Sequence, residues 1–211
     1  MHHRFVIGID EVGRGPIAGP VCVGAFIIHD YSLLAHAPHA LHDSKKLSPQ
    51  KREAWVKYLT DCRKKGKCAF AYSFVSARVI DRIGIAKAIK CALARSIKKL
   101  ERELADENDL LFLDFRENTT VLLDGGLRAP KEYVFQKTII RGDEKEPTIA
   151  LASIVAKVAR DKYMDRLALQ YPLYDFETHK GYGTPSHYKS LRSFGTSPLH
   201  RQSFLTSFDN Q

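Results

Sequence analysis

The chain has 211 residues, 44% of them hydrophobic, and no stretch approaches the roughly 20 consecutive apolar residues of a membrane-spanning helix. Its 33 basic residues outnumber its 24 acidic ones, which gives a formal net charge of +9. This composition excludes a disordered or membrane-embedded protein and favours one ordered domain with a polyanionic partner.

The four cysteines and the N-terminus indicate a cellular compartment. Cys22, Cys62, Cys68 and Cys91 have no CxxC spacing and no matching histidine spacing. We therefore expect free, mostly buried thiols, with neither zinc nor a disulfide, in a reducing environment. Because the first residues lack a signal-peptide pattern, the expected location is the cytoplasm.

The first predicted element is a buried strand over Phe5–Asp10 that ends in two acids, Asp10 and Glu11. Burying unpaired carboxylates costs several kcal/mol, so two acids at the end of a core strand need a cation or strong donors. The Gly-Arg-Gly turn at 13–15 adds a positive charge and backbone amides that can approach a phosphate closely. These residues suggest phosphodiester chemistry, and a solvated turn after an ordinary strand is the plainer alternative.

A nucleotide-binding P-loop is a second alternative for this stretch. The spacing from Gly8 to Gly13 fits a P-loop, but that motif continues with Lys and then Ser or Thr. Arg14 and Gly15 stand at those positions here, so the hydroxyl group that would bind magnesium is missing. The P-loop interpretation fails for this reason.

The next part of the chain alternates between predicted strands and helices. Pro20–His29 is apolar on both faces, which indicates a strand covered on both sides. A solvated loop follows, and its histidines (His36, His39, His42) are not expected to bind metal. Ser48 as N-cap and Pro49 start a helix that ends before Gly66. A strand over Cys68–Val75 and a helical region from Ser76 come next, and its most regular part, 85–104, has an apolar stripe at helical spacing.

The second half of the chain contains two further predicted strands. After an acidic break at 106–109, two short apolar runs cover Leu110–Phe115 and Thr119–Leu123, and the second leads into Asp124. A strand over Val134–Ile140 ends in Arg141, Gly142 and Asp143. An alanine-rich helix from Pro147 to about Leu169 follows, and then a polar, aromatic C-terminal part with a turn at 181–185 and a short helix.

Three predicted strands therefore end in acids next to glycine, at Asp10 with Glu11, at Asp124 and at Asp143. Strand ends at one edge of a mixed sheet converge, so these four carboxylates can meet. Oxygen ligands in that number suit Mg²⁺ or Mn²⁺ rather than zinc. Two such ions can activate a water and stabilise the leaving oxygen of a phosphoryl displacement. Asp114 is an alternative to Asp124, which we prefer because two glycines follow it and leave room for a ligand.

A series of short motifs runs along nearly the whole chain in one order. Asp10-Glu11-Val12-Gly13-Arg14-Gly15-Pro16 comes first, with Ala18-Gly19-Pro20 after it. The later motifs are Asp43–Ser48, Leu123-Asp124-Gly125, Gly142-Asp143, Ala152–Val158 with Arg160-Asp161, His179–Thr184, and His200–Phe204 near the end. Together they resemble ribonuclease HII, the type 2 ribonuclease H, and the last motif resembles the bacterial members. The segment Glu107–Thr120 departs from the family pattern.

The resemblance implies an α/β fold of the RNase H type, with a central mixed five-stranded sheet flanked by helices. It implies a catalytic domain over residues 1–170 and a helical, substrate-contacting C-terminal extension over 171–211 packed on it. The implied activity is metal-dependent cleavage of the RNA strand of RNA–DNA hybrids, and cleavage 5′ of ribonucleotides embedded in duplex DNA. The products carry 3′-hydroxyl and 5′-phosphate ends, and the role is removal of misincorporated ribonucleotides and RNA primers. From its size, we expect the chain to act alone as a monomer.

The resemblance also assigns roles to single residues. Asp10, Glu11, Asp124 and Asp143 are the implied catalytic residues and ligands of two Mg²⁺ or Mn²⁺ ions. Gly13, Arg14 and Gly15 would sense the 2′-hydroxyl group, the feature that distinguishes RNA from DNA at one position. Tyr182 would contact the sugar of the neighbouring deoxynucleotide, and Ser44, Lys45 and Lys46 would hold backbone phosphates.

Two other functional classes stay open from the sequence. One is a nucleic-acid-binding module that keeps the fold without the chemistry, against which the presence of all four acids argues. The other is a different nuclease of the same superfamily, such as a junction resolvase or an RNase HIII-like enzyme. The Gly-Arg-Gly turn together with Tyr182 favours type 2 specificity.

Overall fold

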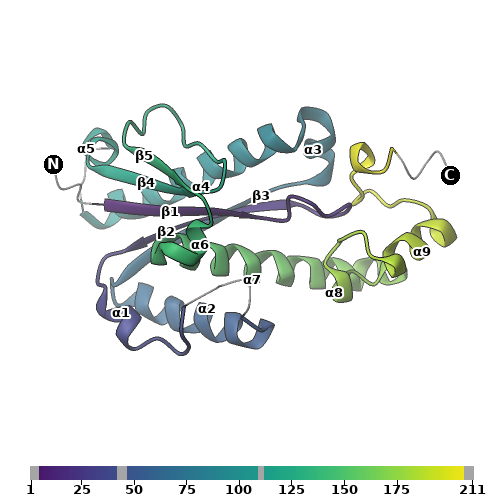
Figure 1. Cartoon of the computed structure of the whole chain (residues 1–211), viewed down its shortest axis with the longest axis horizontal. Coiled ribbons are helices and arrows are strands. Elements are labelled where there is room, and N and C mark those ends of the chain that lie inside the picture. Colours follow the sequence, from purple (N-terminus) through teal and green to yellow (C-terminus); the bar gives the residue numbers. More distant parts are fainter. Residues whose placement is uncertain (1–4, 42–46, 109–111, 207–211) are drawn as a thin grey trace.

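The computed structural model describes residues 5–41, 47–108 and 112–206. A single sheet of five strands runs through its middle, in the order β3-β2-β1-β4-β5 (Figure 1). β2 runs antiparallel to both of its neighbours, β1 and β3, whereas β4 runs parallel to β1 and β5 parallel to β4. The predicted mixed five-stranded sheet is therefore confirmed. Its strands are β1 (Phe5–Val12), β2 (Val21–Ile28), β3 (Cys68–Val75), β4 (Thr119–Asp124) and β5 (Gln136–Ile139).

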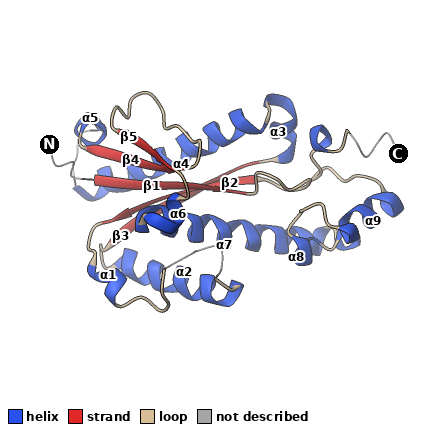
Figure 2. Ribbon diagram, in the orientation of Figure 1, coloured by secondary structure: helices blue, strands red, loops and turns tan. Residues whose placement is uncertain are grey.

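Helices cover both faces of the sheet (Figure 2). On one face, α3 (Ala77–Ile83) and α4 (Ile85–Asn108) lie over a core that includes Ile7 and Ile9 of β1. On the other face, α2 (Pro49–Lys64) and α7 (Pro147–Gln170) enclose a second core with Phe26 and Trp55. Because side chains alternate along a strand, Gly8 and Asp10 face α7.

Two glycines allow α7 to lie directly on the sheet. A Cβ atom on Gly8 would come within 2.1 Å of the backbone carbon of Thr148, and one on Gly24 within 2.3 Å of the Ala152 carbonyl oxygen. Contacts this short leave no room for any side chain larger than hydrogen at either position. The close approach brings the first half of α7 next to the end of β1, where Asp10 lies.

The segment after α7 folds back onto the loop between β1 and β2. It contains α8 (Phe176–His179), α9 (Pro185–Phe194) and short 3-10 helices over 172–174 and 202–204. The amides of Ile17 and Ala18 donate to the Gly181 carbonyl oxygen at 2.9 and 3.1 Å. The division into two domains at residue 170 stays a prediction.

Several predicted boundaries were wrong. The predicted loop over His29–His42 contains a short helix, α1 (Ser32–Ala35). The predicted acidic break at 106–109 is instead helical as far as Asn108, because it contains neither Gly nor Pro and charge alone does not end a helix. Within the segment Glu107–Thr120, which departs from the family pattern, residues Phe112–Glu117 form a helix, α5. The buried carboxylate of Glu101 in α4 accepts a 2.7 Å hydrogen bond from Arg116 and holds α5 in place.

The last predicted strand is shorter than expected. β5 pairs only with the end of β4, and Val134 and Phe135 before it are exposed. Asp143 does not follow a strand directly, because it lies in the helical turn α6 (Gly142–Lys145).

Two further expectations concern the state of the cysteines and the absence of membrane-spanning helices. Cys22, Cys62 and Cys68 are buried, Cys91 is exposed, and all four are free thiols, as predicted. None of the helices in the described ranges is long and apolar enough to span a bilayer.

Candidate active site

Asp10 and Asp124 lie level with each other on neighbouring strands. Ile9 of β1 is the register partner of Leu123 of β4, and the two strands are parallel, so the acids that follow these residues leave the sheet at the same end. Asp10 is 3% exposed and lies on the α7 side. The Asp10 carboxylate also accepts the amide of Glu11 at 2.8 Å, which fixes its orientation at the end of the strand.

The turn after β5 brings Asp143 to the same place. The Gly142 amide donates to Oδ1 of Asp124 at 2.7 Å, so the turn that carries Asp143 is attached directly to the second acid. Arg141 takes a left-handed backbone conformation (φ 53°) that reverses the chain at this point. Asp143 itself is 1% exposed.

The charges of these acids act on one another. The pKa of Asp10 is raised to about 8, chiefly by burial and also by the negative charges of Glu11, Asp124 and Asp143, and a hydrogen bond with Ser153 opposes this rise. All four acids are therefore close enough to repel, and bringing them together without a counter-ion destabilises the ionised site.

The donor set fits a hard divalent cation. Carboxylate oxygens are the preferred ligands of Mg²⁺ and Mn²⁺, and a cation among them would offset the repulsion that raises the pKa of Asp10. As they stand, no three His, Cys, Asp or Glu side chains within the described ranges are arranged to hold a metal ion. The four predicted ligands thus share one electrostatic site without forming a closed coordination shell.

A cleft of about 310 Å³ joins several predicted site residues. Asp10, Glu11, the 13–15 turn and Tyr182 all line it. Asp143 lines a neighbouring cavity of about 360 Å³ beside Trp55. The predicted phosphate-binding residues Ser44, Lys45 and Lys46 lie outside the described residues.

The two glycines of the 13–15 turn differ in their surroundings. Gly13 has a φ of +87°, and a Cβ atom there would lie 2.1 Å from Nε of Arg160. Gly15 has no atom within 4 Å of such a Cβ. Gly13 is therefore required by the packing of the protein itself, whereas the space beside Gly15 is open to a ligand. The exposed Arg14 side chain reaches back to Glu11, with 3.7 Å between Nη1 and Oε1.

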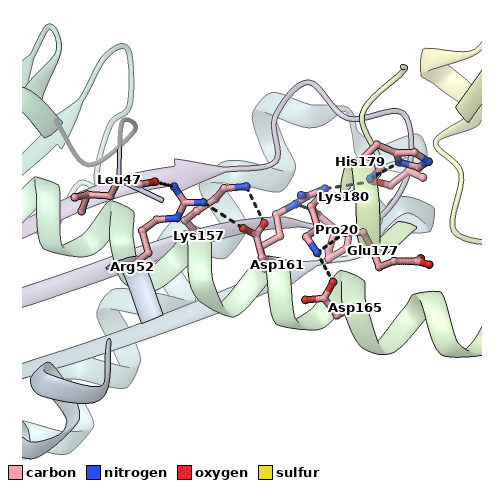
Figure 3. A network of polar contacts seen from close by, with 12 residues as sticks. Pro20, Leu47, Arg52, Lys157, Asp161, Asp165, Glu177, His179 and Lys180 are labelled. Carbon is pink, nitrogen blue, oxygen red and sulfur yellow. Dashed lines mark hydrogen bonds and ion pairs between the residues drawn. The ribbon is translucent and has the colours of Figure 1, made fainter. Parts of the chain in front are cut away.

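Sequence reasoning missed two cations in the cleft, Arg52 of α2 and Lys157 of α7. Both are directed toward Asp161 (Figure 3). Nζ of Lys157 lies 2.7 Å from Oδ1 of Asp161, and Nη2 of Arg52 lies 3.9 Å from Oδ2. Arg52 also donates to the Leu47 carbonyl oxygen. The i, i+4 spacing of Lys157 and Asp161 in a predicted helix was the available signal, but nothing in the sequence paired Arg52 with them.

Tyr182 lies on a turn that is held at several points. Tyr182 is 43% exposed, and the Arg160 guanidinium carbon lies 5.9 Å from the centre of its ring. Lys180, just before it, donates to the Glu177 carbonyl oxygen at 2.7 Å and pairs with Asp165 of α7 (Figure 3). The exposed face of the ring is thus available to a ligand.

Three buried histidines lie behind this turn, and their hydrogen bonds fit one assignment of protons. Nδ1 of His187 donates to the Tyr182 carbonyl oxygen at 2.9 Å, which leaves its Nε2 as an acceptor. Nε2 of His200, 3.0 Å away, must then donate to it, and Nδ1 of His200 accepts the Ser197 amide at 2.8 Å. His179 donates through Nε2 to the Tyr174 carbonyl oxygen and accepts the Gly181 amide through Nδ1. All three rings are neutral in this arrangement.

We expect the Tyr182 turn to loosen in acid. Burial lowers the pKa of His187 and of His200 to about 4 from the usual 6.5. A lowered histidine pKa means that the unfolded chain binds more protons, so stability is lost as pH falls from about 6.5 toward 4, by up to about 3 kcal/mol for each ring. Protection factors for amide exchange over 179–201 should fall across this range while those of α4 stay constant. Equal losses in both segments would contradict a local effect of the histidines.

The chain is similar to known proteins over nearly its whole length. Residues 7–207 match the family model described as Ribonuclease HII. The chain is 44% identical over 200 residues to the Ribonuclease HII of Shouchella clausii, covering 94% of this chain and 68% of that protein. It is 38% identical over 203 residues to the Ribonuclease HII of Caldicellulosiruptor bescii, covering 96% and 87% of the two chains.

A solved structure has a similar fold. The match is to a chain in the PCNA:RNase HII complex from Archaeoglobus fulgidus, with a TM-score of 0.67 and 26% identity over 95% of this chain and 94% of that one. The similarity confirms the fold that the sequence motifs implied.

Proposed function

The chain belongs to the ribonuclease HII family, whose members are ribonuclease H hydrolases of RNA–DNA hybrids, and we propose that it also cuts 5′ of single ribonucleotides embedded in duplex DNA. The products carry 3′-hydroxyl and 5′-phosphate ends. The observation that supports this specificity is one cleft that joins two acids, the 13–15 turn and Tyr182. A site built only to hydrolyse phosphodiesters would need the acids alone.

We propose that Asp10, Glu11, Asp124 and Asp143 hold two Mg²⁺ or Mn²⁺ ions. When bound, such ions activate a water molecule and stabilise the charge on the leaving 3′ oxygen. The protein residues supply binding and orientation. Arg52 and Lys157 are cations in the cleft and would attract the phosphate backbone, while Asp161 holds their side chains in place.

Recognition of the ribonucleotide is assigned to the 13–15 turn and Tyr182. Backbone groups of the turn would contact the 2′-hydroxyl group, which both donates and accepts hydrogen bonds, without regard to base identity. The exposed ring of Tyr182 would pack on the adjoining deoxyribose. Because one copy of the chain supplies every residue named here, we propose that it acts as a monomer in removing misincorporated ribonucleotides and RNA primers.

The decisive experiment is a cleavage assay with three matched duplexes: one with a single ribonucleotide, one RNA–DNA hybrid and one of DNA alone. With Mg²⁺ or Mn²⁺ we expect cleavage of the first two and none of the third, and no cleavage with a chelator. Ligation and primer extension would identify the product ends. Cleavage of branched all-DNA substrates would support a junction resolvase, and binding without cleavage would support a non-catalytic module.

Binding should weaken steeply as salt concentration rises. The net charge is +9, and each phosphate that the protein neutralises releases counter-ions from the duplex. If at least four phosphates are contacted, log K should fall with log salt with a slope of about −3 or steeper. Fluorescence anisotropy on a labelled duplex with the Asp10→Asn variant measures this without turnover. A flat response would exclude the basic surface as the docking site.

A further inference from the structure

Arg201, near the end of the described chain, binds the 13–15 turn from inside the protein. Its side chain is fully buried and donates to three backbone carbonyl oxygens: Nη2 to Gly13 at 2.7 Å, Nη1 to Arg14 at 2.9 Å and Nε to Gly19 at 3.0 Å. One planar guanidinium thus fixes both ends of the loop between β1 and β2. Its fork of donors suits this task, because the geometry of the five N–H groups is rigid.

These contacts determine where the opposite side of the turn points. In a planar trans peptide the C=O and N–H groups point in opposite directions. Since the carbonyls of Gly13 and Arg14 point toward Arg201, the amides of Arg14 and Gly15 point away from it. Among the described residues neither amide has a hydrogen-bond partner. Both residues line the cleft, so two free donors are presented where a ligand oxygen can reach them.

A second buried arginine supports the same loop. Arg160 of α7 is fully buried and donates to the carbonyl oxygens of Pro20 at 3.0 Å and Ala18 at 3.4 Å. Within the described ranges neither arginine forms an ion pair with a carboxylate. Two buried guanidiniums near each other cost free energy through desolvation and mutual repulsion, and both effects lower the pKa of Arg201 to about 10. Because both buried charges cost free energy, we do not explain the presence of both arginines by stability alone.

Backbone hydrogen bonds connect the β1–β2 loop to the turn that carries Tyr182. The Arg201 amide donates to the Ile17 carbonyl oxygen at 2.8 Å, and the amides of Ile17 and Ala18 donate to the carbonyl oxygen of Gly181. The 13–15 turn and the Tyr182 turn therefore share one set of backbone hydrogen bonds. A shift in one is transmitted to the other over a few peptide units.

We propose that Arg201 is a positioning residue for ribonucleotide recognition, which aims the free amides of Arg14 and Gly15 into the cleft and holds them in register with Tyr182. This role rests on the proposed function, because the ligand oxygen is taken to be the 2′-hydroxyl group. Arg201 does not touch the substrate. It acts through the backbone of the turn that does.

The first test uses Arg201→Lys and Arg201→Ala with Arg192→Lys as the control. Lysine keeps the charge but cannot span three carbonyls, and Arg192 lies exposed on α9 in the same part of the chain. For a duplex with one ribonucleotide we expect both Arg201 variants to lose kcat by about tenfold to a hundredfold, with KM nearly unchanged. Guanidinium ion added to Arg201→Ala should restore part of kcat, and methylammonium at equal ionic strength should not. Full activity in Arg201→Lys overturns the proposal.

The second test does not depend on activity and needs no substitution at Arg201. In the wild-type protein, amide exchange should be fast at Arg14 and Gly15 and slow at Ile17 and Ala18. When Asp10→Asn binds a duplex with one ribonucleotide, the first two amides should become protected, and an all-DNA duplex should leave them exposed. Protection at Arg14 and Gly15 in the free protein refutes the positioning role. Wild-type protein that cuts no ribonucleotide-containing duplex refutes the proposed function instead, while the exchange pattern of the free protein still tests the position of the amides.

Discussion

Replacing Asp10 by asparagine is expected to abolish cleavage and, at the same time, to stabilise the metal-free protein. The loss of rate should be about a thousandfold or more, because several kcal/mol of transition-state charge stabilisation depend on the ions that this carboxylate is proposed to hold. Affinity for the duplex should change little, since the basic surface remains. Single-turnover cleavage and anisotropy titrations measure the two quantities separately.

The stability gain follows from the electrostatics of the empty acid cluster. The pKa of Asp10 is raised to about 8 in the folded protein, so folding takes up a proton between the ordinary carboxyl pKa and that value. Stability that is present in acid is therefore lost as pH rises toward 8, and asparagine avoids this loss. With a chelator present, the difference in unfolding free energy between variant and wild type should grow by about 1 kcal/mol per pH unit over this range. Asp61→Asn, which removes an exposed carboxylate of α2 away from the acid cluster, is the control. Retained cleavage, or a constant difference in stability, would contradict this account of Asp10.

Alanine at Gly13 and alanine at Gly15 should have opposite consequences, although the two glycines are separated by a single residue. Gly13→Ala is expected to destabilise the protein by about 3 kcal/mol, because the left-handed φ and the contact with Arg160 both oppose a side chain. Gly15→Ala meets no atom and has no left-handed φ, so the free energy of unfolding should change by less than about 0.5 kcal/mol.

Gly15→Ala, the variant that keeps its stability, should lose activity. If the backbone at 15 approaches the ribose, an added methyl group blocks that approach, and Gly15→Ala should lose at least about tenfold in kcat/KM while it stays fully folded. Urea titrations and cleavage of the single-ribonucleotide duplex give the two readouts, and Gly66→Ala, far from the cleft, controls for a left-handed glycine without close neighbours. Wild-type activity in Gly15→Ala would place the ribose elsewhere.

Most of the sheet could be predicted from the sequence, because its strands are continuous apolar runs with clear ends. β1, β2 and β3 begin and end within two residues of the predicted limits. α5 could not be predicted, since a run of six residues is too short to show a helical period and its position depends on Glu101 of another helix. β5 was overestimated because Val134 and Phe135, although apolar, are exposed and lie before the first register pair of β5 with β4.

The positions of the acids could be predicted from the sequence, but the contacts of the buried residues that hold the neighbouring turns could not. Asp10 and Asp124 stand where strands end, which is visible along the sequence, and the parallel register of β1 and β4 then places them side by side. Arg201 lies in the His200–Phe204 motif, but the motif does not indicate what its side chain contacts. Its carbonyl partners lie between 182 and 188 residues away, and a backbone carbonyl offers no residue type to match. The same holds for His187 and His200, whose pairing depends on how two short helical segments pack.

The hydrogen bond between Arg201 and Gly13 joins residues 188 positions apart. During synthesis the sheet and α7 can form while the last tenth of the polypeptide is still inside the ribosome, so the acids can be assembled before the recognition loop is anchored. A nascent or prematurely terminated chain that ends before position 201 should therefore possess the four carboxylates proposed to bind metal, but not the anchored turn that we propose distinguishes ribose from deoxyribose. The order of translation thus leaves the anchor of the proposed recognition turn until last.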